Sequence, residues 1–287
     1  MRLPLLTPAI LLALIGLSPL LCQVAVRPKL LVHGHRGARA RRPENTIPAF
    51  QYAIEQGVDA LEMDMAVTKD NVIVISHDPI LEGPVCTGPA PKAVIHELTL
   101  AEVRQWDCGA VQNPRFATQQ TIPGTRMPTL DEVFQLAGRG SFDYNIETKS
   151  FPDKPEYTPP PEEFARMVLD KIRKHKLEKR IILQSFDFRT LIAMRKLAPE
   201  IRLSALTETD RRDFTAIAGD AGKAEIVSPE FHLVTVAKVE AAHQAGLEVV
   251  PWTANTPADW DRLIQAKVDA IITDDPAELI AYLKKRR

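Results

Sequence analysis

The sequence has few cysteines, few aromatic residues and almost no net charge, and each shortage excludes a class of protein. Its three cysteines show no spacing typical of a zinc site. Aromatic residues make up 6% of the 287 residues, and the formal net charge is −1. Stacking surfaces and a strongly basic field, which nucleic-acid binding requires, are therefore both missing. We expect no nucleic-acid partner.

The N-terminal segment has the pattern of a secretory signal peptide. No charged residue occurs between the second residue and Arg27, and residues 10–17 form an apolar run. We predict a signal peptide over residues 1–25, which directs the mature protein to the periplasm or out of the cell. The segment is also long enough to remain as a membrane anchor. Its three prolines make a permanent helix less favourable, so we expect no stable membrane span after cleavage.

Signal cleavage would leave Cys86 and Cys108 as a pair in an oxidising compartment. A disulfide between them would close a loop of about 20 residues and stabilise the fold by roughly 3 kcal/mol in the chain-entropy model. Two buried free thiols are the alternative interpretation.

The stretch 61–79, LEMDMAVTKDNVIVISHDP, carries the first candidate site residues. Glu62 and Asp64 are two residues apart, so on a strand both side chains point to the same side. Asp70-Asn71 suits a two-residue hairpin turn, and the β-branched residues after it predict a second strand. With this turn, His77 would lie opposite Asp64. A slip of one residue would move the imidazole to the other face of the hairpin.

Alternating apolar runs and helical patterns predict a (β/α)8 TIM-type barrel over residues 26–287. The hairpin strand cannot be parallel to its predecessor, because a parallel connection needs about a dozen residues. It is therefore an extra strand, followed by a small irregular insertion at about 79–128. Without it eight strands remain, at residues 30–32, 58–64, 142–146, 181–183, 201–206, 225–227, 247–252 and 270–272.

Polar residues follow several of these strands, at the barrel end where active sites lie. Three of them, Glu62, Asp64 and Glu147, are carboxylates that would converge at one mouth. Such charges are unfavourable together unless a cation neutralises them, and oxygen ligands favour Ca²⁺ or Mg²⁺. Alternatively, each carboxylate has its own Lys or Arg partner.

His35 and His77 are the candidates for proton transfer, since one imidazole can accept a proton while the other donates one. His33 lies on the same side of its strand as His35, so periodicity does not exclude it. A lone histidine is more often structural, but two beside a carboxylate cluster favour catalysis.

Three further residues could bind substrate. Arg36 and Lys149 are cations suited to a phosphate group. Trp252 offers an apolar wall, or else is a core aromatic residue. The basic loop at 39–42 could steer an anionic substrate toward the site, but we expect it to be an ordinary solvated loop.

These residues belong to motifs that resemble the glycerophosphodiester phosphodiesterase family. The motifs span nearly the whole mature chain in the family's order: HRGA at 35–38, PENT at 43–46, EMD at 62–64, TKD at 68–70, HD at 77–78, LTLAEV at 98–103, MPTLDEV at 127–133, NIETK at 145–149, QSFD at 184–187, PWTAN at 251–255 and IITDDP at 271–276. Asn71 replaces the glycine usual after TKD.

The resemblance implies hydrolysis of glycerophosphodiesters to glycerol 3-phosphate and an alcohol. By motif it assigns acid–base catalysis to His35 and His77, and the metal ion to Glu62, Asp64 and Glu147. It assigns phosphate binding to Arg36 and Lys149, and the glycerol side of the substrate to Trp252. In the family a substrate hydroxyl is thought to attack phosphorus, and water then opens the cyclic phosphate. Two rival functions remain: a lysophospholipase D or other lipid phosphodiesterase, and a non-catalytic phosphate-ligand binding protein.

Overall fold

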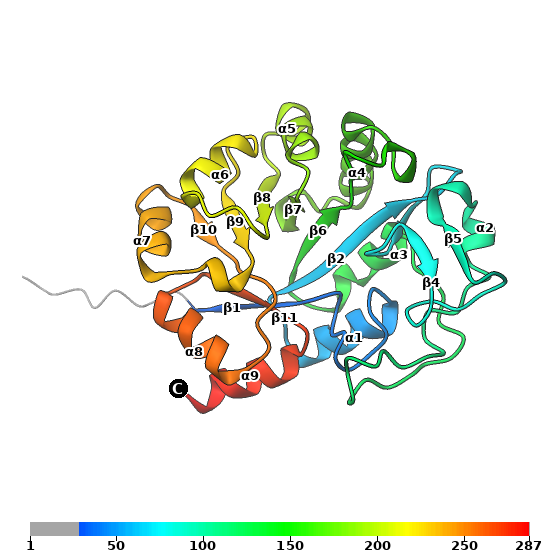
Figure 1. Ribbon diagram of the computed structural model, residues 1–287, viewed down its shortest axis with the longest axis horizontal. Coiled ribbons are helices and arrows are strands. Elements are labelled where there is room, and N and C mark those ends of the chain that lie inside the picture. The colour runs from blue at the N-terminus through cyan, green and yellow to red at the C-terminus, as the bar shows by residue number, and fades with distance from the viewer. Residues whose placement is uncertain (1–28, 287) are drawn as a thin grey trace, which may run out of the picture.

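The computed structural model describes residues 29–286, and within them eight parallel strands form the predicted barrel (Figure 1). Backbone hydrogen bonds from Asp269 to Val249 and from Ile272 to Pro251, each 3.0 Å, join the two ends of the sheet. The (β/α)8 prediction is confirmed. The barrel strands are β1 (Leu31–Gly34), β2 (Ala60–Val67), β6 (Asp143–Thr148), β7 (Ile181–Ser185), β8 (Arg202–Thr207), β9 (Ile226–Pro229), β10 (Glu248–Val249) and β11 (Ala270–Thr273).

Helices surround the strands on the outside of the barrel, apart from the short helix at residues 100–103, which lies beside the barrel (Figure 1). Several of them begin or end at capping residues that the sequence supplies. The Thr46 hydroxyl accepts a hydrogen bond at the start of the first helix, and Gly57 ends it with a φ of 85°, which favours glycine. The helices are α1 (Ile47–Gln56), α2 (Leu100–Val103), α3 (Leu130–Phe134), α4 (Pro161–His175), α5 (Phe188–Leu197), α6 (Phe214–Asp220), α7 (Val236–Gln244), α8 (Pro257–Ala266) and α9 (Pro276–Lys285).

Apolar side chains fill both sides of the strand layer. Every residue of β2 is buried, as the strand of a sheet covered on both faces should be. Outside the strands, Phe50, Phe164 and Trp260 are fully buried against the sheet. Burying each such side chain stabilises the fold by about 1.5–3 kcal/mol. This packing holds the strand ends, and the polar residues on them, in fixed positions.

The hairpin strand β3 (Ile73–Ile75) pairs antiparallel with β2, but the predicted register is wrong by one residue. Ser76 lies opposite Asp64, and its backbone N–H donates to the Asp64 carbonyl at 2.9 Å. The turn has three residues, 69–71, because Asn71 adopts a φ of 57° and the N–H of Thr68 bonds to the carbonyl of Val72. His77 follows the end of β3, so strand alternation does not fix its direction.

The stretch after the hairpin folds as a compact lobe beside the barrel. It contains a short antiparallel pair, β4 (Ile80–Glu82) with β5 (Lys92–Val94), which the sequence analysis did not predict. Cys86 and Cys108 form a disulfide, so the disulfide and not the pair of free thiols is the correct one of the two interpretations left open by the sequence. Both cysteines pack with Trp106 in a small hydrophobic cluster of their own. The disulfide therefore stabilises a segment that has little regular secondary structure.

The predicted signal peptide, residues 1–25, lies outside the described residues. Within residues 29–286, no helix is long and apolar enough to cross a membrane.

Candidate active site

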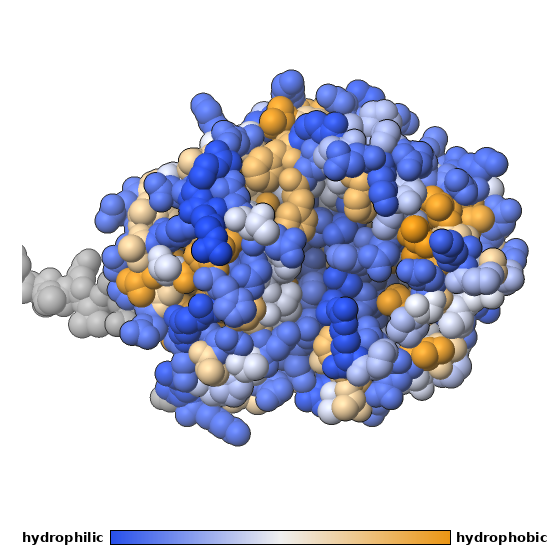
Figure 2. All heavy atoms as spheres, in the orientation of Figure 1, coloured by the Kyte–Doolittle hydropathy of each residue, from blue (hydrophilic) through white to orange (hydrophobic). Residues whose placement is uncertain are grey.

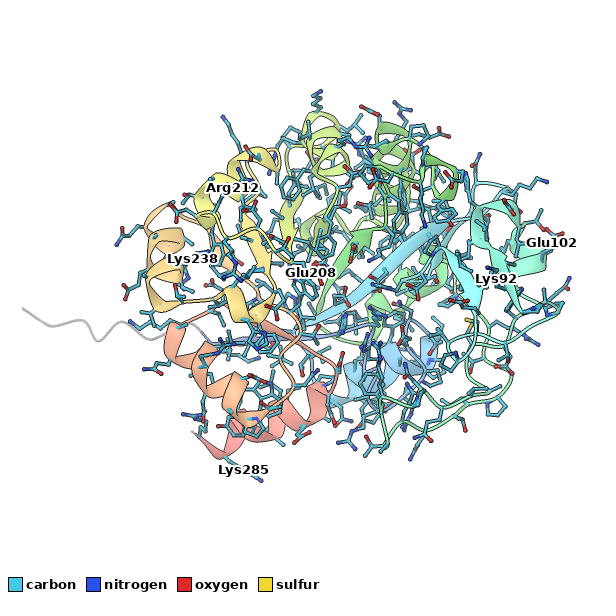
Figure 3. All side chains as sticks on the ribbon, in the orientation of Figure 1. Lys92, Glu102, Glu208, Arg212, Lys238 and Lys285 are labelled. Carbon is cyan, nitrogen blue, oxygen red and sulfur yellow. A yellow bond between two sulfur atoms is a disulfide. The ribbon has the colours of Figure 1, made fainter. Side chains whose placement is uncertain are left out.

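One cavity at the carboxyl ends of the strands brings together all eight predicted site residues. It has a volume of about 300 Å³. In Figure 2 the centre of this face is a hollow lined mainly by hydrophilic residues, and Figure 3 labels Glu208 beside it. The lining comprises the predicted residues His35, Arg36, Glu62, Asp64, His77, Glu147, Lys149 and Trp252, together with Gln184, Phe186, Leu206, Glu208 and Ile272.

The three carboxylates line this cavity close to one another. Glu62 and Asp64 extend from β2, and the parallel register with β6 places Glu147 directly beside Asp64. One oxygen atom of each carboxylate lies within 4.8 Å of the others, and all three residues are buried. Oxygen atoms at this spacing fit the ligand set of a hard divalent cation. The group could therefore hold a metal ion.

Two cations of the chain partly compensate these three negative charges. Lys149 Nζ lies 3.0 Å from Glu147 Oε1 and 3.8 Å from Asp64 Oδ1, and Arg36 Nε lies 3.3 Å from Asp64 Oδ2. Glu62 is bonded by uncharged donors, the backbone N–H of Arg36 at 2.8 Å and Gln184 Nε2 at 2.9 Å. The alternative that each carboxylate has its own Lys or Arg is therefore wrong for Glu62.

The protonation behaviour of the three carboxylates reflects this shortage of positive charge. Burial and the charge of Asp64 raise the pKa of Glu62 well above its usual value. Burial likewise raises the pKa of Glu147 to about 7. Burial acts on Asp64 in the same direction, but the charges of His77, Arg36 and Lys149 outweigh it and hold its pKa below the usual range. A divalent cation would supply the missing charge and keep all three carboxylates ionised.

His35 is held in one orientation by an acidic residue from the other end of the chain. Its Nδ1–H donates to Asp274 Oδ1 at 2.5 Å, which leaves Nε2 on the side of Glu62, 3.9 Å from Oε2. Burial lowers the pKa of His35 to about 4, although Asp274 acts in the opposite direction. The imidazole is therefore neutral at pH 7, and Nε2 can accept a proton.

Asp274 is itself fixed by two further side chains. Arg39 Nε lies 2.8 Å from Asp274 Oδ1, and Asn255 Nδ2 donates to Oδ2 at 2.8 Å. Arg41 in the same loop pairs with Asp275 at 2.6 Å. The expectation that the 39–42 loop is merely solvated is therefore wrong, because two of its arginines anchor the loop to the end of β11.

His77 lies on the opposite side of the acidic cluster and is more exposed than His35. Its Nδ1–H donates to Asp78 Oδ1 at 2.8 Å, so Nε2 is the ring atom left for a ligand. Its side chain is 34% exposed, compared with 11% for His35. Both imidazoles therefore line the same cavity, His35 in its interior and His77 nearer to the solvent.

The remaining wall is aromatic. Trp252 and Phe186 make an edge-to-face contact, with ring centroids 5.5 Å apart, and Phe186 remains 42% exposed. Trp252 Nε1 donates to the carbonyl of Ser228, which fixes the ring. The predicted apolar wall is therefore present, and it is the rim of the cavity rather than part of the core.

Three residues that hydrogen-bond to the site residues lie in the motifs, but the sequence did not predict these hydrogen bonds. They are Gln184, Asp274 and Asn45, whose Nδ2 donates to Asp64 Oδ2 at 2.9 Å. Each lies at or beside the end of a predicted strand or helix, and this position is the one feature of the sequence that could have identified it as a site residue. The alternation of side chains along the strand did not exclude His33 as a catalytic residue, but its side chain does not point into the cavity. It is bonded to Asn145 and does not line the cavity.

The fold and the cavity define the class: a (β/α)8-barrel enzyme whose site gathers acidic oxygens, fixed cations and two imidazoles at the strand ends. Residues 35–278 match the model of the Glycerophosphoryl diester phosphodiesterase family. The chain belongs to this family and is an enzyme of the phosphoric diester hydrolase class.

Individual relatives agree with the family match. A glycerophosphodiester phosphodiesterase of Caldanaerobacter subterraneus subsp. tengcongensis is 34% identical over 261 residues, which are 90% of this chain and 99% of that protein. A crystal structure from Silicibacter pomeroyi DSS-3, a putative glycerophosphoryl diester phosphodiesterase, has 31% identity and a TM-score of 0.82, covering 90% of this chain and 96% of its own. An Oleispira antarctica phosphodiesterase in complex with the product sn-glycerol-3-phosphate shares the fold at 22% identity and a TM-score of 0.76, covering 88% of this chain and 96% of its own.

Proposed function

We propose that the protein hydrolyses glycerophosphodiesters to glycerol 3-phosphate and an alcohol, using one Ca²⁺ or Mg²⁺ ion and proton transfer by His35 and His77. The observation that carries the proposal is the convergence of three buried carboxylates, two cations and two imidazoles in one cavity. The glycerol 3-phosphate named for the Oleispira antarctica relative also supports it.

His35 would act as the base of the first step. Its Nδ1–H is donated to Asp274, so Nε2 carries the lone pair. It would take the proton of the glycerol hydroxyl next to the phosphoester, whose oxygen then forms a bond to phosphorus. The bond from phosphorus to the alcohol oxygen breaks in the same displacement. Water would then open the cyclic phosphate to give glycerol 3-phosphate.

His77 would act as the acid. The alcohol oxygen must gain a proton as it leaves, and Nε2 of His77 is available at the more exposed side of the cavity. When water attacks the cyclic phosphate, the two imidazoles would exchange these tasks, since each then holds the proton state left by the first step. General acid–base catalysis of this kind contributes about 10²- to 10⁴-fold to the rate.

Glu62, Asp64 and Glu147 would hold the divalent cation, which supplies positive charge to the phosphate oxygens when bound. Arg36 and Lys149 would bind the same phosphate group from the protein side. Both are largely buried and rigidly paired, so they can stabilise developing negative charge without first reorganising.

The test is release of glycerol 3-phosphate by the wild-type protein and by His77→Ala. We expect the substitution to remove almost all turnover with a neutral-alcohol leaving group, because it removes the proposed proton donor to the leaving oxygen. A substrate with a p-nitrophenolate leaving group needs no such proton and should be rescued in part. Equal loss on both substrates would contradict the acid role of His77.

A lipid phosphodiesterase on the same fold is the second candidate. The exposed ring of Phe186 beside Trp252 gives the cavity an apolar rim on which an acyl chain could lie. Hydrolysis of lysophosphatidylcholine at a higher kcat/KM than glycerophosphocholine would favour this candidate, and the reverse order would favour the first.

We also propose that residues 26–287 act as one domain in the periplasm or outside the cell. The disulfide between Cys86 and Cys108 supports this location, because disulfides persist mainly in oxidising compartments. Cell fractionation together with the mass of the mature chain tests the location and the cleavage of residues 1–25. An uncleaved protein in the cytoplasm would refute both.

A further inference from the structure

We propose that a second cavity, next to His77, binds the alcohol part of the diester and that its Glu82 selects alcohols carrying a positively charged amine. This inference rests on the proposed function. The second cavity has a volume of about 170 Å³, and His77 lines both it and the cavity of the acidic cluster. A diester whose phosphate is held beside His77 therefore has one of its two organic groups within reach of the second cavity.

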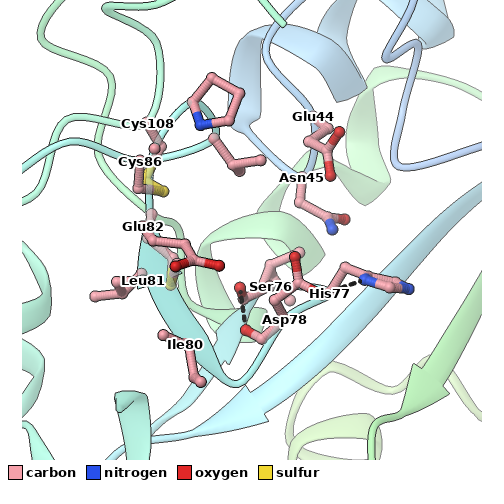
Figure 4. Close-up of a pocket in the computed structure, with 15 residues that line it drawn as sticks. Glu44, Asn45, Ser76, His77, Asp78, Ile80, Leu81, Glu82, Cys86 and Cys108 are labelled. Carbon is pink, nitrogen blue, oxygen red and sulfur yellow. Dashed lines mark hydrogen bonds and ion pairs between the residues drawn. A yellow bond between two sulfur atoms is a disulfide. The ribbon is translucent and has the colours of Figure 1, made fainter. Parts of the chain in front are cut away.

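The second cavity is built mainly by the lobe that follows the hairpin (Figure 4). Strand β4 with the turn after it, the Cys86–Cys108 disulfide and Met127 form one wall, and the Glu44-Asn45 loop before α1 forms the other. The disulfide joins two parts of the lobe and thereby holds this wall together. A small cavity with such walls fits a short head group better than a long chain.

The two cavities differ in the charged residues that line them. The first is lined by Arg36 and Lys149 together with four carboxylates, those of the acidic cluster and of Glu208. The second contains no lysine or arginine among its lining residues in the described chain, and three carboxylates line it: Glu44, Asp78 and Glu82. A diester with a negative phosphate and a cationic alcohol would match this difference, because its phosphate would face Arg36, Lys149 and the proposed metal ion while its cationic alcohol would face carboxylates alone.

Glu82 is the carboxylate of this cavity that remains available to a ligand. Glu44 is held by Arg36 NH1 at 2.6 Å, and Asp78 accepts the hydrogen bond of His77. Within residues 29–286, the structure records neither an ion pair nor a side-chain hydrogen bond for Glu82, although Lys92 is its neighbour across the β4–β5 pair. Figure 4 shows the Glu82 carboxylate pointing into the space that Glu44 and Asn45 also face.

The ligand class follows from this geometry. An ammonium or quaternary ammonium group, as in ethanolamine or choline, would lie against Glu82 while its alcohol oxygen stays with the phosphate near His77. A neutral alcohol such as glycerol would fit the volume without the charge interaction. Glu82 is exposed, so the discrimination is modest, about fivefold in kcat/KM, as for an ion pair in contact with solvent.

The test compares kcat/KM for glycerophosphoethanolamine and for glycerophosphoglycerol, measured as glycerol 3-phosphate release at low ionic strength. We expect the ratio of the two to fall about fivefold in Glu82→Gln and further in Glu82→Lys. The matched control is Glu55→Gln, which removes the same charge from an exposed position on α1 that does not line either cavity. It should keep the wild-type ratio. Added salt should reduce the wild-type ratio toward that of Glu82→Gln, because it screens the exposed charge.

Three outcomes separate the claims. A ratio that falls in both Glu82 variants and not in Glu55→Gln supports the subsite. Glycerol 3-phosphate release with the same ratio in the wild type and both Glu82 variants overturns the subsite and leaves the proposed function standing. Absence of release from both substrates in the wild-type protein, with Ca²⁺ or Mg²⁺ present, overturns the proposed function and the subsite with it.

Discussion

Replacing Asp274 with asparagine tests how the site orients its base. In the wild-type protein the Asp274 carboxylate can only accept, so His35 must carry its proton on Nδ1 and keep the lone pair on Nε2. An asparagine at this position can turn its amide NH₂ toward Nδ1. The proton would then move to Nε2, and the atom facing the cavity would no longer accept the proton of the attacking hydroxyl.

The expected loss follows from the bond that is removed. A hydrogen bond to a charged group contributes about 1.5–3 kcal/mol, which corresponds to a decrease in kcat of about 10- to 160-fold when it acts only on the orientation of the base. The KM should change less, because Asp274 does not line the cavity. The steady-state rate of glycerol 3-phosphate release, measured across pH, gives both constants.

Asp275→Asn is the control for this substitution. Asp275 also has an arginine partner, Arg41 at 2.6 Å, and it caps α9, but the structure records no bond from it to His35. Both variants lose an ion pair, and thermal melting would report their stability. A kcat for Asp274→Asn within about twofold of that for Asp275→Asn would refute the claim that Asp274 orients His35.

Three further predictions concern stability. Phe164→Ala, in the buried face of α4, should lower the free energy of unfolding by about 3–5 kcal/mol in urea titration. Replacing Cys86 and Cys108 together with serine should lower it by about 3 kcal/mol and make the melting temperature insensitive to reductant; an unchanged melting temperature would contradict this. Burial lowers the pKa of His33 to about 4, so the unfolded chain binds this proton more readily. Stability should therefore decrease as the pH falls from 6.5 toward 4, and His33→Asn should weaken this dependence in acid titration followed by circular dichroism.

The barrel was predictable from the sequence because its signals are local. Each strand is a short apolar run, each helix has a 3.6-residue pattern with a cap, and the polar residues that follow the strands mark the catalytic end. These signals were enough to predict that Glu62, Asp64 and Glu147 lie together at the carboxyl end of the barrel. Parallel strands align their carboxyl ends whatever the exact register of the loops.

The errors occurred where one backbone angle or a distant contact decides the structure. The hairpin register depends on the positive φ of Asn71, and Asp70-Asn71 fits a two-residue and a three-residue turn equally well. The partner of His35 is 239 residues away, and no pattern along the chain pairs Arg39 with the same aspartate. Strands of three residues, such as β4, are too short for alternation to identify them.

The most direct test of the whole account is metal dependence of the reaction at the acidic cluster. The protein is stripped with chelator, and glycerol 3-phosphate release is followed as Ca²⁺ or Mg²⁺ is returned. We predict that wild-type turnover disappears and is restored by one of the two ions. Glu147→Gln should need a much higher concentration of that ion, because one of its three oxygen ligands becomes neutral. Full turnover in the presence of chelator, or unchanged ion dependence in Glu147→Gln, would contradict the account.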